Sequence, residues 1–490
     1  MIRAGEIPEI IQGGMGVAVS SWRLAGAVAE CGQLGVVSGT ALDLVLARRL
    51  QDGDEGGHVR RALDRFPDQD VADRVLARYF LDGGRAEGES YAPILKMAIT
   101  PNRSSQELLI LGGFVETWLA KEGHDGLIGI NCLEKIQLST PGTLYGAMLA
   151  GVDVVLMGAG VPRAIPHLLD TLAVHGDVTF DIDVADAGEV EYALDFSPRD
   201  VIASDEAPLT RPVFLAIVSA HVLAAYLARD PEIRPDGFVV EASSAGGHNA
   251  PPRQQLLDEH GDLVFGPRDE PDLQKIAKAG LPYWIAGGSG TPEMLAAARE
   301  AGARGIQVGT VFALSSDCGL DPGVRAQLLE GVARDDLVVR TDPVASPTGF
   351  PFKVVDVPGT MSDDANYGAR ERLCDLGYLR TPFAKDAGTI GYRCAGEPSH
   401  MYVRKGGDES DTVGRKCLCN GLAAAVGMGQ QRRTGYRELP IVTLGSDLQA
   451  PGRLIERYPG GWTAAEAIDW MLSPVWQAAS EPADAEPSMR

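Results

Sequence analysis

The feature that most constrains the fold is an alternation of short apolar runs with stretches of helical character. Most runs end in glycine, serine or asparagine, and several are followed by an amphipathic stretch. This alternation is typical of βαβ units, in which helices join parallel strands. Eight runs follow the pattern, at residues 9–14, 34–39, 126–132, 152–158, 213–219, 237–242, 283–288 and 305–310.

Eight such strands predict an α/β fold of the TIM (β/α)8 barrel class rather than a doubly wound sheet. A dinucleotide-binding doubly wound fold needs G-x-G-x-x-G directly after its first strand, and QGGMGVAVS at 12–20 lacks that spacing. The sequence also predicts barrel helices, of which the last has a Thr N-cap and Pro at its first helical position, at residues 21–32, 143–151, 221–230 and 291–302.

The barrel is expected to occupy residues 1–325 and to carry two long insertions, at about 41–125 and 159–211. The second insertion contains VTFDIDV, whose alternation of apolar and polar residues predicts a hairpin at 178–184.

Beyond about residue 320 the strand and helix alternation stops. Residues 326–475 are rich in Gly, Pro and Arg and are predicted to form a smaller C-terminal lid or extension, which is expected to cover the barrel or to form a homodimer. Within it, Thr463 and Glu466 form a capping box that opens a short helix. Residues 476–490 are predicted to be a disordered tail.

Composition restricts the partners. The formal net charge of −23 disfavours nucleic acid backbones and anionic membrane surfaces, which require basic patches. The seven cysteines are scattered and odd in number, which indicates reduced thiols. The first ten residues lack the apolar run of a signal peptide, and no stretch approaches the ~20 apolar residues of a membrane span. We therefore expect a soluble cytoplasmic protein that acts on a small molecule.

Glycine-rich strand ends mark the expected site, because the active site of such a barrel lies at the carboxyl ends of its strands. AGGSG at 286–290 ends the seventh strand, and QVGT at 307–310 ends the eighth. The loops after these two strands are where barrels of this class bind a phosphate, with backbone N–H groups and a helix N-terminus.

Several motifs occur together in one order, namely IIQGGMG, AGAVAECGQLGVVSG, GIN, MGAG, AGGH, IAGG and QVGT. Over about residues 7–320 they resemble the nitronate monooxygenase family (2-nitropropane dioxygenase-like), which is related to the flavin-dependent enoyl-acyl-carrier-protein reductases. The resemblance implies a TIM barrel that carries FMN, with a smaller lid domain over the site.

The resemblance also implies roles for individual residues. His248, in AGGH, matches the active-site histidine and is the expected general base, since imidazole titrates near neutral pH. The residues expected to bind the cofactor are Gly14, Met15, Asn131, Glu241, Gly246, Gly247, Gly287, Gly288, Gln307, Gly309 and Thr310.

Two enzymatic functions remain open. The first is FMN-dependent oxidation of alkyl nitronates or nitroalkanes with O2, which needs no nicotinamide. The alternative is an NAD(P)H-dependent FMN enoyl-thioester reductase, for which the basic cluster of Arg432, Arg433 and Arg437 would help to receive a carrier-protein arm. A non-catalytic flavin-binding module is disfavoured, because binding alone does not need a titratable group such as that of His248.

A metal centre was weighed and is not predicted. Cys394, His400, Cys417 and Cys419 are ligand types that zinc accepts. Their Cys-x-Cys spacing nevertheless matches poorly with the usual zinc motifs, and no second pair follows. Reduced thiols in a Gly-rich segment are the favoured interpretation.

Overall fold

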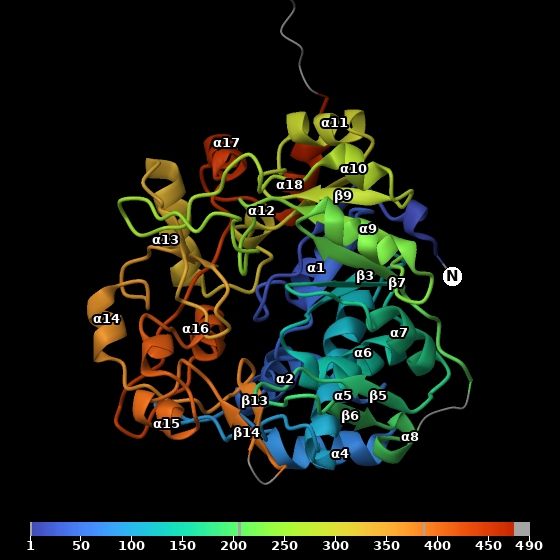
Figure 1. The fold of residues 1–490 in the computed structure, drawn as a ribbon. Helices are drawn as coiled ribbons and strands as arrows, with labels where there is room; N and C mark the ends of the chain where they lie inside the picture. The colour runs from blue at the N-terminus through green and yellow to red at the C-terminus, as the bar shows by residue number, and fades with distance from the viewer. Residues whose placement is uncertain (1, 204–206, 386–387, 475–490) are drawn as a thin grey trace, which may run out of the picture.

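The computed structural model describes residues 2–203, 207–385 and 388–474 and shows an eight-stranded parallel barrel (Figure 1). The strand order is β1-β10-β9-β8-β7-β4-β3-β2. Hydrogen bonds from Gln12 N to the Leu34 carbonyl (3.0 Å) and from Leu34 N to the Ile10 carbonyl (3.1 Å) join the two end strands. All eight predicted strands are confirmed, as β1 (Ile10–Gln12), β2 (Gly35–Ser38), β3 (Ile128–Leu133), β4 (Val154–Gly158), β7 (Val213–Val218), β8 (Gly237–Glu241), β9 (Tyr283–Ala286) and β10 (Gly305–Val308).

Two apolar layers hold the barrel together. Inside it, side chains from alternate strand positions pack into one cluster, which includes Val36, Leu156, Leu215 and Trp284. The other strand positions face outward and pack with the surrounding helices in the larger core. This division follows from the alternation of side chains along a strand, and the fully buried strands are apolar on both faces.

The predicted barrel helices are also confirmed. They are α1 (Trp22–Glu30), α6 (Thr140–Leu149), α9 (His221–Arg229) and α11 (Pro292–Glu300). At the start of α11 the Thr291 side chain accepts a hydrogen bond from Met294 N, as expected for an N-cap. A short 3-10 helix, η1 (Ala4–Glu6), precedes β1, and α10 (Leu273–Ala277) precedes β9.

The segment expected as the first insertion does not protrude from the barrel as a separate unit. Its last helix packs directly against the barrel helix α6. Added side chains would not fit there, since a Cβ on Gly113 would lie 2.2 Å from the Thr143 carbonyl and one on Gly146 1.9 Å from the Ile110 carbonyl. The segment holds α2 (Leu42–Gln51), η2 (Glu55–Gly57), α3 (His58–Leu63), α4 (Gln69–Tyr79) and α5 (Arg103–Lys121). The glycines allow α5 and α6 to approach closely.

The second insertion contains the predicted hairpin. Strand β5 (Val178–Asp181) pairs antiparallel with β6 (Ala193–Phe196), so a hairpin at VTFDIDV is confirmed. Helix α7 (Ile165–Ala173) precedes it and packs on α6, and α8 (Pro198–Val201) follows it. A 3-10 helix, η3 (Gln137–Ser139), leads into α6.

The extension lies beside the barrel, with α14 to α16 in orange in Figure 1. Two antiparallel hairpins form its framework, β11 (Val339–Asp342) with β12 (Phe352–Val355) and β13 (Thr381–Ala384) with β14 (Ile390–Arg393). A small core that includes Phe352, Leu418 and Ile441 also takes in Ile136 from the barrel. Its helices are α14 (Asp364–Ala369), α15 (Ser399–Arg404), η4 (Glu409–Thr412) and α16 (Leu418–Ala425).

After the extension the chain returns to the barrel. Helix α17 (Gln449–Arg457) packs on α13 (Pro322–Arg334) and α12 (Thr310–Ala313), and α18 (Ala464–Met471) packs on α1, α11 and α12. The capping box of Thr463 and Glu466 opens α18 as predicted. The boundary between barrel and extension stays a prediction, and the tail predicted at 476–490 lies outside the described residues.

Among residues 2–203, 207–385 and 388–474, no helix combines the length and apolar character needed to cross a membrane.

Candidate active site

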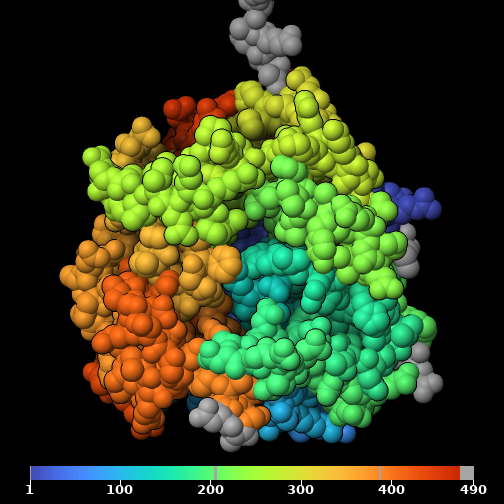
Figure 2. Space-filling view, in the orientation of Figure 1, coloured from blue at the N-terminus to red at the C-terminus, as the bar shows by residue number. Residues whose placement is uncertain are grey.

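A cavity opens at the carboxyl ends of the barrel strands, where the barrel meets the extension. Figure 2 shows a hollow at this place, with blue N-terminal residues visible at its bottom. The cavity has an empty volume of about 1850 Å³, part of which is open to solvent. Every residue expected in the site lines it, namely Gly14, Met15, Asn131, Glu241, Gly246, Gly247, His248, Gly287, Gly288, Gln307, Gly309 and Thr310.

The loop after β1 is shaped by one buried serine. The Ser20 hydroxyl donates to the Gly13 carbonyl (2.8 Å) and accepts from Met15 N (2.9 Å), which folds the loop back on itself. This conformation places Gly14 against β3, because a Cβ added there would lie 2.3 Å from the Asn131 Cβ. The loop backbone therefore presents a flat edge to the cavity without a side chain at Gly14.

Two buried amide oxygens on the cavity wall have no hydrogen-bond partner among the described residues. Asn131 donates its Nδ2 to the Gly14 carbonyl (3.0 Å) and leaves Oδ1 unpaired. Gln307, at the end of β10, leaves Oε1 unpaired in the same way. Buried acceptors without partners cost about 1–3 kcal/mol each, so these two oxygens indicate a ligand with N–H or O–H donors.

The loop after β9 has the backbone of an anion cradle. Gly287 (φ +92°) and Gly288 (φ +65°) both adopt the left-handed region that favours glycine. The N–H groups of Gly288, Ser289 and Gly290 donate to no other group in the described part of the chain, and helix α11 begins directly after them. The exposed Asp447 carboxylate lies next to Gly288 and is an unfavourable neighbour for a phosphate.

The neighbouring strand end is closed by the extension. The Thr310 hydroxyl, at the start of α12, accepts from Gly445 N (2.9 Å), and Ser446 N donates to the Ser244 carbonyl (2.9 Å). These contacts place residues 443–447 over both glycine loops, so that end of the cavity has a wall from the extension.

His248 projects into the cavity from the loop after β8. Its Nε2 is hydrogen-bonded to the Ser346 hydroxyl (2.7 Å), and its ring meets Phe352 edge to face at 4.9 Å between centroids. Burial, together with the positive charge of Lys135, lowers the pKa of His248 to about 3. The imidazole is therefore neutral over the whole physiological pH range.

The AGGH loop is fixed on both sides by the extension. Gly247 N donates to the Thr443 hydroxyl (2.8 Å), and Lys353 N donates to the Gly247 carbonyl (2.9 Å). Asn249 N in turn donates to the Pro351 carbonyl (3.0 Å). The backbone around His248 thus forms a short antiparallel bridge with β12.

Lys135 is a site residue that the sequence analysis missed. It follows β3, donates through Nζ to the Ala159 carbonyl (2.6 Å) and lies over the Phe350 ring at 3.3 Å from its centroid. Burial lowers its pKa to about 8, against an opposing effect of Glu134. Its place directly after a barrel strand was the only signal that would have found it.

Glu241 is the second titratable group of the cavity, at the carboxyl end of β8. Burial raises its pKa to about 7. Both His248 and Glu241 are therefore shifted toward their neutral forms by the same physical cause.

Beyond His248 the cavity continues between the barrel and the extension as an apolar arm. The side chains that line this arm are Leu133, Ile136, Leu379, Leu418, Leu422 and Ile441. Phe352 is buried at its edge, whereas Phe350 is partly exposed and does not line the cavity. Of the two phenylalanines in SPTGFPFK, only Phe352 therefore lines the cavity.

The structure also places the candidate zinc ligands and Arg432 of the basic cluster. Among the described residues no three His, Cys, Asp or Glu side chains form a group that would hold a metal ion. Of the four weighed as zinc ligands, only Cys419 lines the cavity. Arg432 is not a free cation, because it pairs with Asp375 (2.5 Å) and with Glu438.

Comparison with known proteins agrees with the resemblance seen in the sequence. The fold is an α/β barrel with a cavity at the carboxyl ends of its strands. Residues 179–345, roughly a third of the chain, match the family model described as nitronate monooxygenase. The matched segment contains His248 and both glycine loops, and it supports the prediction of an oxidoreductase enzyme. A search of curated proteins finds no match.

Among solved structures, FabK from Thermotoga maritima is 15% identical, with a TM-score of 0.46 over 95% of this chain and 91% of that one. Nitroalkane oxidase from Streptomyces ansochromogenes is 14% identical, with a TM-score of 0.41 and 94% of each chain covered. The enoyl reductase domain of MlnA from Bacillus amyloliquefaciens is 12% identical, with a TM-score of 0.49 over 94% and 92%. Likenesses at this level assign no activity to the chain.

The electrostatic effect of Lys135 on His248 generates a prediction about pH. Replacing Lys135 with methionine removes the cation that disfavours protonation of the imidazole, so the pKa of His248 rises above about 3. It stays below the usual value of about 6.5 because the ring remains buried. NMR titration of 15N-labelled histidine measures the change, and a His248→Asn spectrum assigns the signal.

Lys353→Met is the matched control, since Lys353, on β12, is a buried lysine whose pKa is also lowered to about 8. Its Nζ donates to Thr341, and its charge has no part in lowering the pKa of His248. Equal shifts of the His248 signal in both variants would contradict the assigned role of Lys135.

Proposed function

We propose that the protein is an FMN-dependent oxidoreductase that oxidises alkyl nitronates with O2 in this cavity. The observation that carries the proposal is a partly buried His248, with a pKa lowered to about 3, facing a cavity that two glycine loops also line. The family match spans both features.

The residues of the cavity fit FMN. The unpaired Oδ1 of Asn131 and Oε1 of Gln307 suit the N–H and O–H groups of a flavin ring and ribityl chain. The N–H groups of Gly288, Ser289 and Gly290, with the start of α11, suit its phosphate, whereas the exposed Asp447 carboxylate beside Gly288 opposes it.

In this arrangement Gly14, Met15, Asn131, Glu241, Gly246, Gly247 and Gln307 would lie along the ring and ribityl chain, and Gly287, Gly288, Gly309 and Thr310 would surround the phosphate. FMN held by these residues would supply one-electron redox chemistry, which the oxidation of a nitronate by O2 requires.

His248 would hold the nitronate. The Ser346 hydroxyl is hydrogen-bonded to Nε2 of His248, whereas Nδ1 of His248 has no hydrogen-bond partner among the described residues. When the Ser346 hydroxyl donates to Nε2, the proton resides on Nδ1, which then donates to a nitronate oxygen. A pKa of about 3 makes the imidazole a weak base, because efficient general bases have a pKa near the working pH. The low pKa of His248 therefore favours a preformed nitronate over a neutral nitroalkane.

The alternative function is an NAD(P)H-dependent enoyl-thioester reductase. The apolar arm beyond His248 favours it, because Leu418, Leu422 and Ile441 would accommodate an acyl chain. The basic cluster offers less support than the sequence suggested, since Arg432 is engaged in ion pairs.

Replacement of Gly288 with valine tests cofactor binding. Its Cβ would lie 2.6 Å from Asp447 Oδ2 and would enter the phosphate cradle, so FMN occupancy should fall at least about tenfold. Gly302→Val is the matched control, because Gly302 also has a positive φ (+83°) but lies outside the cavity. Flavin absorbance per chain measures the outcome, and equal occupancy in the two variants would place the phosphate elsewhere.

The choice between the two functions is tested without oxygen. The protein loaded with FMN is mixed first with NADPH and then with an alkyl nitronate, and flavin absorbance is followed. The proposal expects bleaching by the nitronate and none by NADPH. Bleaching by NADPH alone would establish the reductase instead.

His248→Asn separates hydrogen bonding to the nitronate from proton abstraction. Because a preformed nitronate has already lost its proton, loss of a general base would slow only the neutral nitroalkane, by about 10²–10⁴-fold. Loss of a positioning hydrogen bond slows both substrates by a similar factor, which is the result expected from the low pKa of His248. Steady-state turnover of the two substrates measures the difference, and unchanged turnover of both would remove His248 from the site.

A further inference from the structure

The apolar arm of the cavity begins beside His248, so a ligand bound at His248 has a direct path into it. The His248 ring meets Phe352 edge to face, with 4.9 Å between the ring centroids. Phe352 belongs to a small apolar core that also contains buried side chains of the arm, namely Ile136, Leu379, Leu418 and Ile441. Leu133 and Leu422 pack against this core and line the cavity as well. The arm therefore continues the His248 site between the barrel and the extension.

The wall of the arm suits a hydrocarbon. Its six side chains are all leucine or isoleucine, which have no hydrogen-bonding groups. Tyr378 lines the cavity next to them, but its hydroxyl donates to Asp43 on α2 (2.7 Å). A polar ligand would lose its hydrogen bonds to water in such a place, whereas a hydrocarbon chain is stabilised by leaving water.

The arm is narrow where it passes α16. Leu418 is 0% exposed and Ile441 is 1% exposed. A Cβ added to Gly421 would lie 2.4 Å from Ile441 Cγ1, and Ile441 N donates to the Gly421 carbonyl (2.9 Å), so the helix and residue 441 are in close contact. The half-buried Leu133 and Leu422 leave more room. A slot of this shape accepts an unbranched chain more readily than a branched one.

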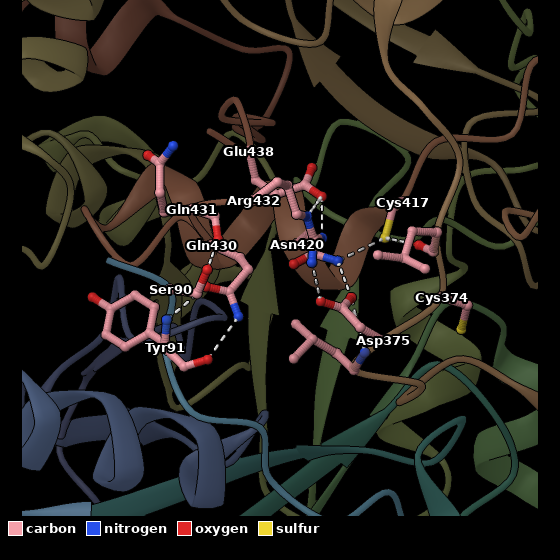
Figure 3. A network of polar contacts seen from close by, with 12 residues as sticks. Ser90, Tyr91, Cys374, Asp375, Cys417, Asn420, Gln430, Gln431, Arg432 and Glu438 are labelled. Atoms are coloured by element: carbon pink, nitrogen blue, oxygen red, sulfur yellow. Dashed lines mark hydrogen bonds and ion pairs between the residues drawn. The ribbon is translucent and has the colours of Figure 1, made fainter. Parts of the chain in front are cut away.

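A polar network holds two extension segments of the arm together. Figure 3 shows that Asn420 of α16 and Arg432 both bind Asp375, at 2.7 and 2.5 Å. Asp375 lies four residues before Leu379, and Asn420 lies two residues before Leu422. The two segments that carry these leucines are therefore joined by a hydrogen bond and an ion pair to one carboxylate. Widening the arm for a branched chain would disturb these bonds.

The same network joins the extension to the first insertion. Gln430 exchanges two hydrogen bonds with the backbone of Tyr91 (2.8 and 3.1 Å), and the Ser90 hydroxyl donates to the Gln431 carbonyl (2.6 Å), as Figure 3 shows. Residues 90 and 91 lie between α4 and α5. This second connection further restricts movement of the extension away from the arm.

We propose that the arm binds the unbranched hydrocarbon chain of the substrate and so selects long primary nitronates over short or branched ones. The inference rests on the proposed function for its polar group. A nitronate oxygen would bind Nδ1 of His248, and the chain would pass Phe352 into the arm. Burial of hydrocarbon strengthens binding by about two- to fourfold per methylene. The straight acyl chain of a thioester has the same chemistry, so the test includes both sources.

Linear alkanoates test the arm without turnover, because a carboxylate is a planar anion with two oxygens, as a nitronate is. Isothermal titration calorimetry uses the full-length protein with added FMN. Affinity should rise by about two- to fourfold per methylene from butanoate through hexanoate to octanoate. 2-Propylpentanoate has the carbon number of octanoate in a branched form and should bind at least about tenfold more weakly. Equal affinities for the two isomers, no rise with length, or no binding of any alkanoate would overturn the inference.

A filled arm gives the second test. Leu422→Trp should weaken octanoate binding at least about tenfold and leave butanoate binding within about twofold, because only the longer chain reaches the added ring. Leu439→Trp is the matched control, since Leu439 is also a half-buried leucine packed against the same small core but does not line the cavity. Equal losses in the two variants would contradict the assignment. The comparison of the two isomers uses the unmodified protein and stays valid if a variant fails to fold.

Turnover distinguishes the two sources of the chain. The nitronates of 1-nitrobutane and 1-nitrooctane are compared in the presence of O2, and the N-acetylcysteamine thioesters of but-2-enoic and oct-2-enoic acid are compared with NADPH. We expect kcat/KM to be at least about tenfold higher for the longer nitronate. Length dependence with the thioesters alone would give the arm to an acyl chain and remove the nitronate function. Equal kcat/KM for the two nitronates would leave that function in place and overturn the role of the arm.

Discussion

The site depends on hydrogen bonds between the AGGH loop and two distant segments of the extension. Ser346, which bonds to His248, is 98 residues further along the chain, and Thr443, which bonds to Gly247, is 196 residues beyond its partner. A glycine pair provides little conformational preference of its own, so these contacts fix the direction of the histidine. The barrel provides the strand end that precedes His248, and the extension determines where the His248 side chain points.

Burial governs the charge of this cavity. His248 would normally gain a proton in mild acid, and Glu241 would normally lose one there, yet burial lowers the pKa of His248 to about 3 and raises that of Glu241 to about 7. The other influences on an anion are the backbone N–H groups at Gly288 to Gly290, the charge of Lys135 and the opposing charge of Asp447. Such a cavity selects by shape and by hydrogen-bond donors more than by its own ionised groups.

The sequence predicted best those features of the fold and the site that depend on residues close together in the chain. Apolar runs, the Thr291 cap and the strand-end glycines each depend on neighbours in the chain, and they identified the barrel and the lining of the cavity. The roles of Ser346 and Thr443 depend on pairing across the extension, which no local pattern encodes. The interpretation of Arg432 as part of a free basic cluster was limited for the same reason, since its ion pair with Asp375 joins residues far apart in the chain.

The path of the chain also restricts how the cavity opens. The extension leaves the barrel after α13 and returns through α17 and α18, which pack on α1, α11, α12 and α13. A segment with one connection to the barrel can rotate about that connection in many directions. A segment with two connections can rotate only about the line that joins them. A wider opening at His248 would therefore need a limited rotation of the whole extension. The lengths of the two connecting segments, rather than a single hinge, would set the size of that rotation.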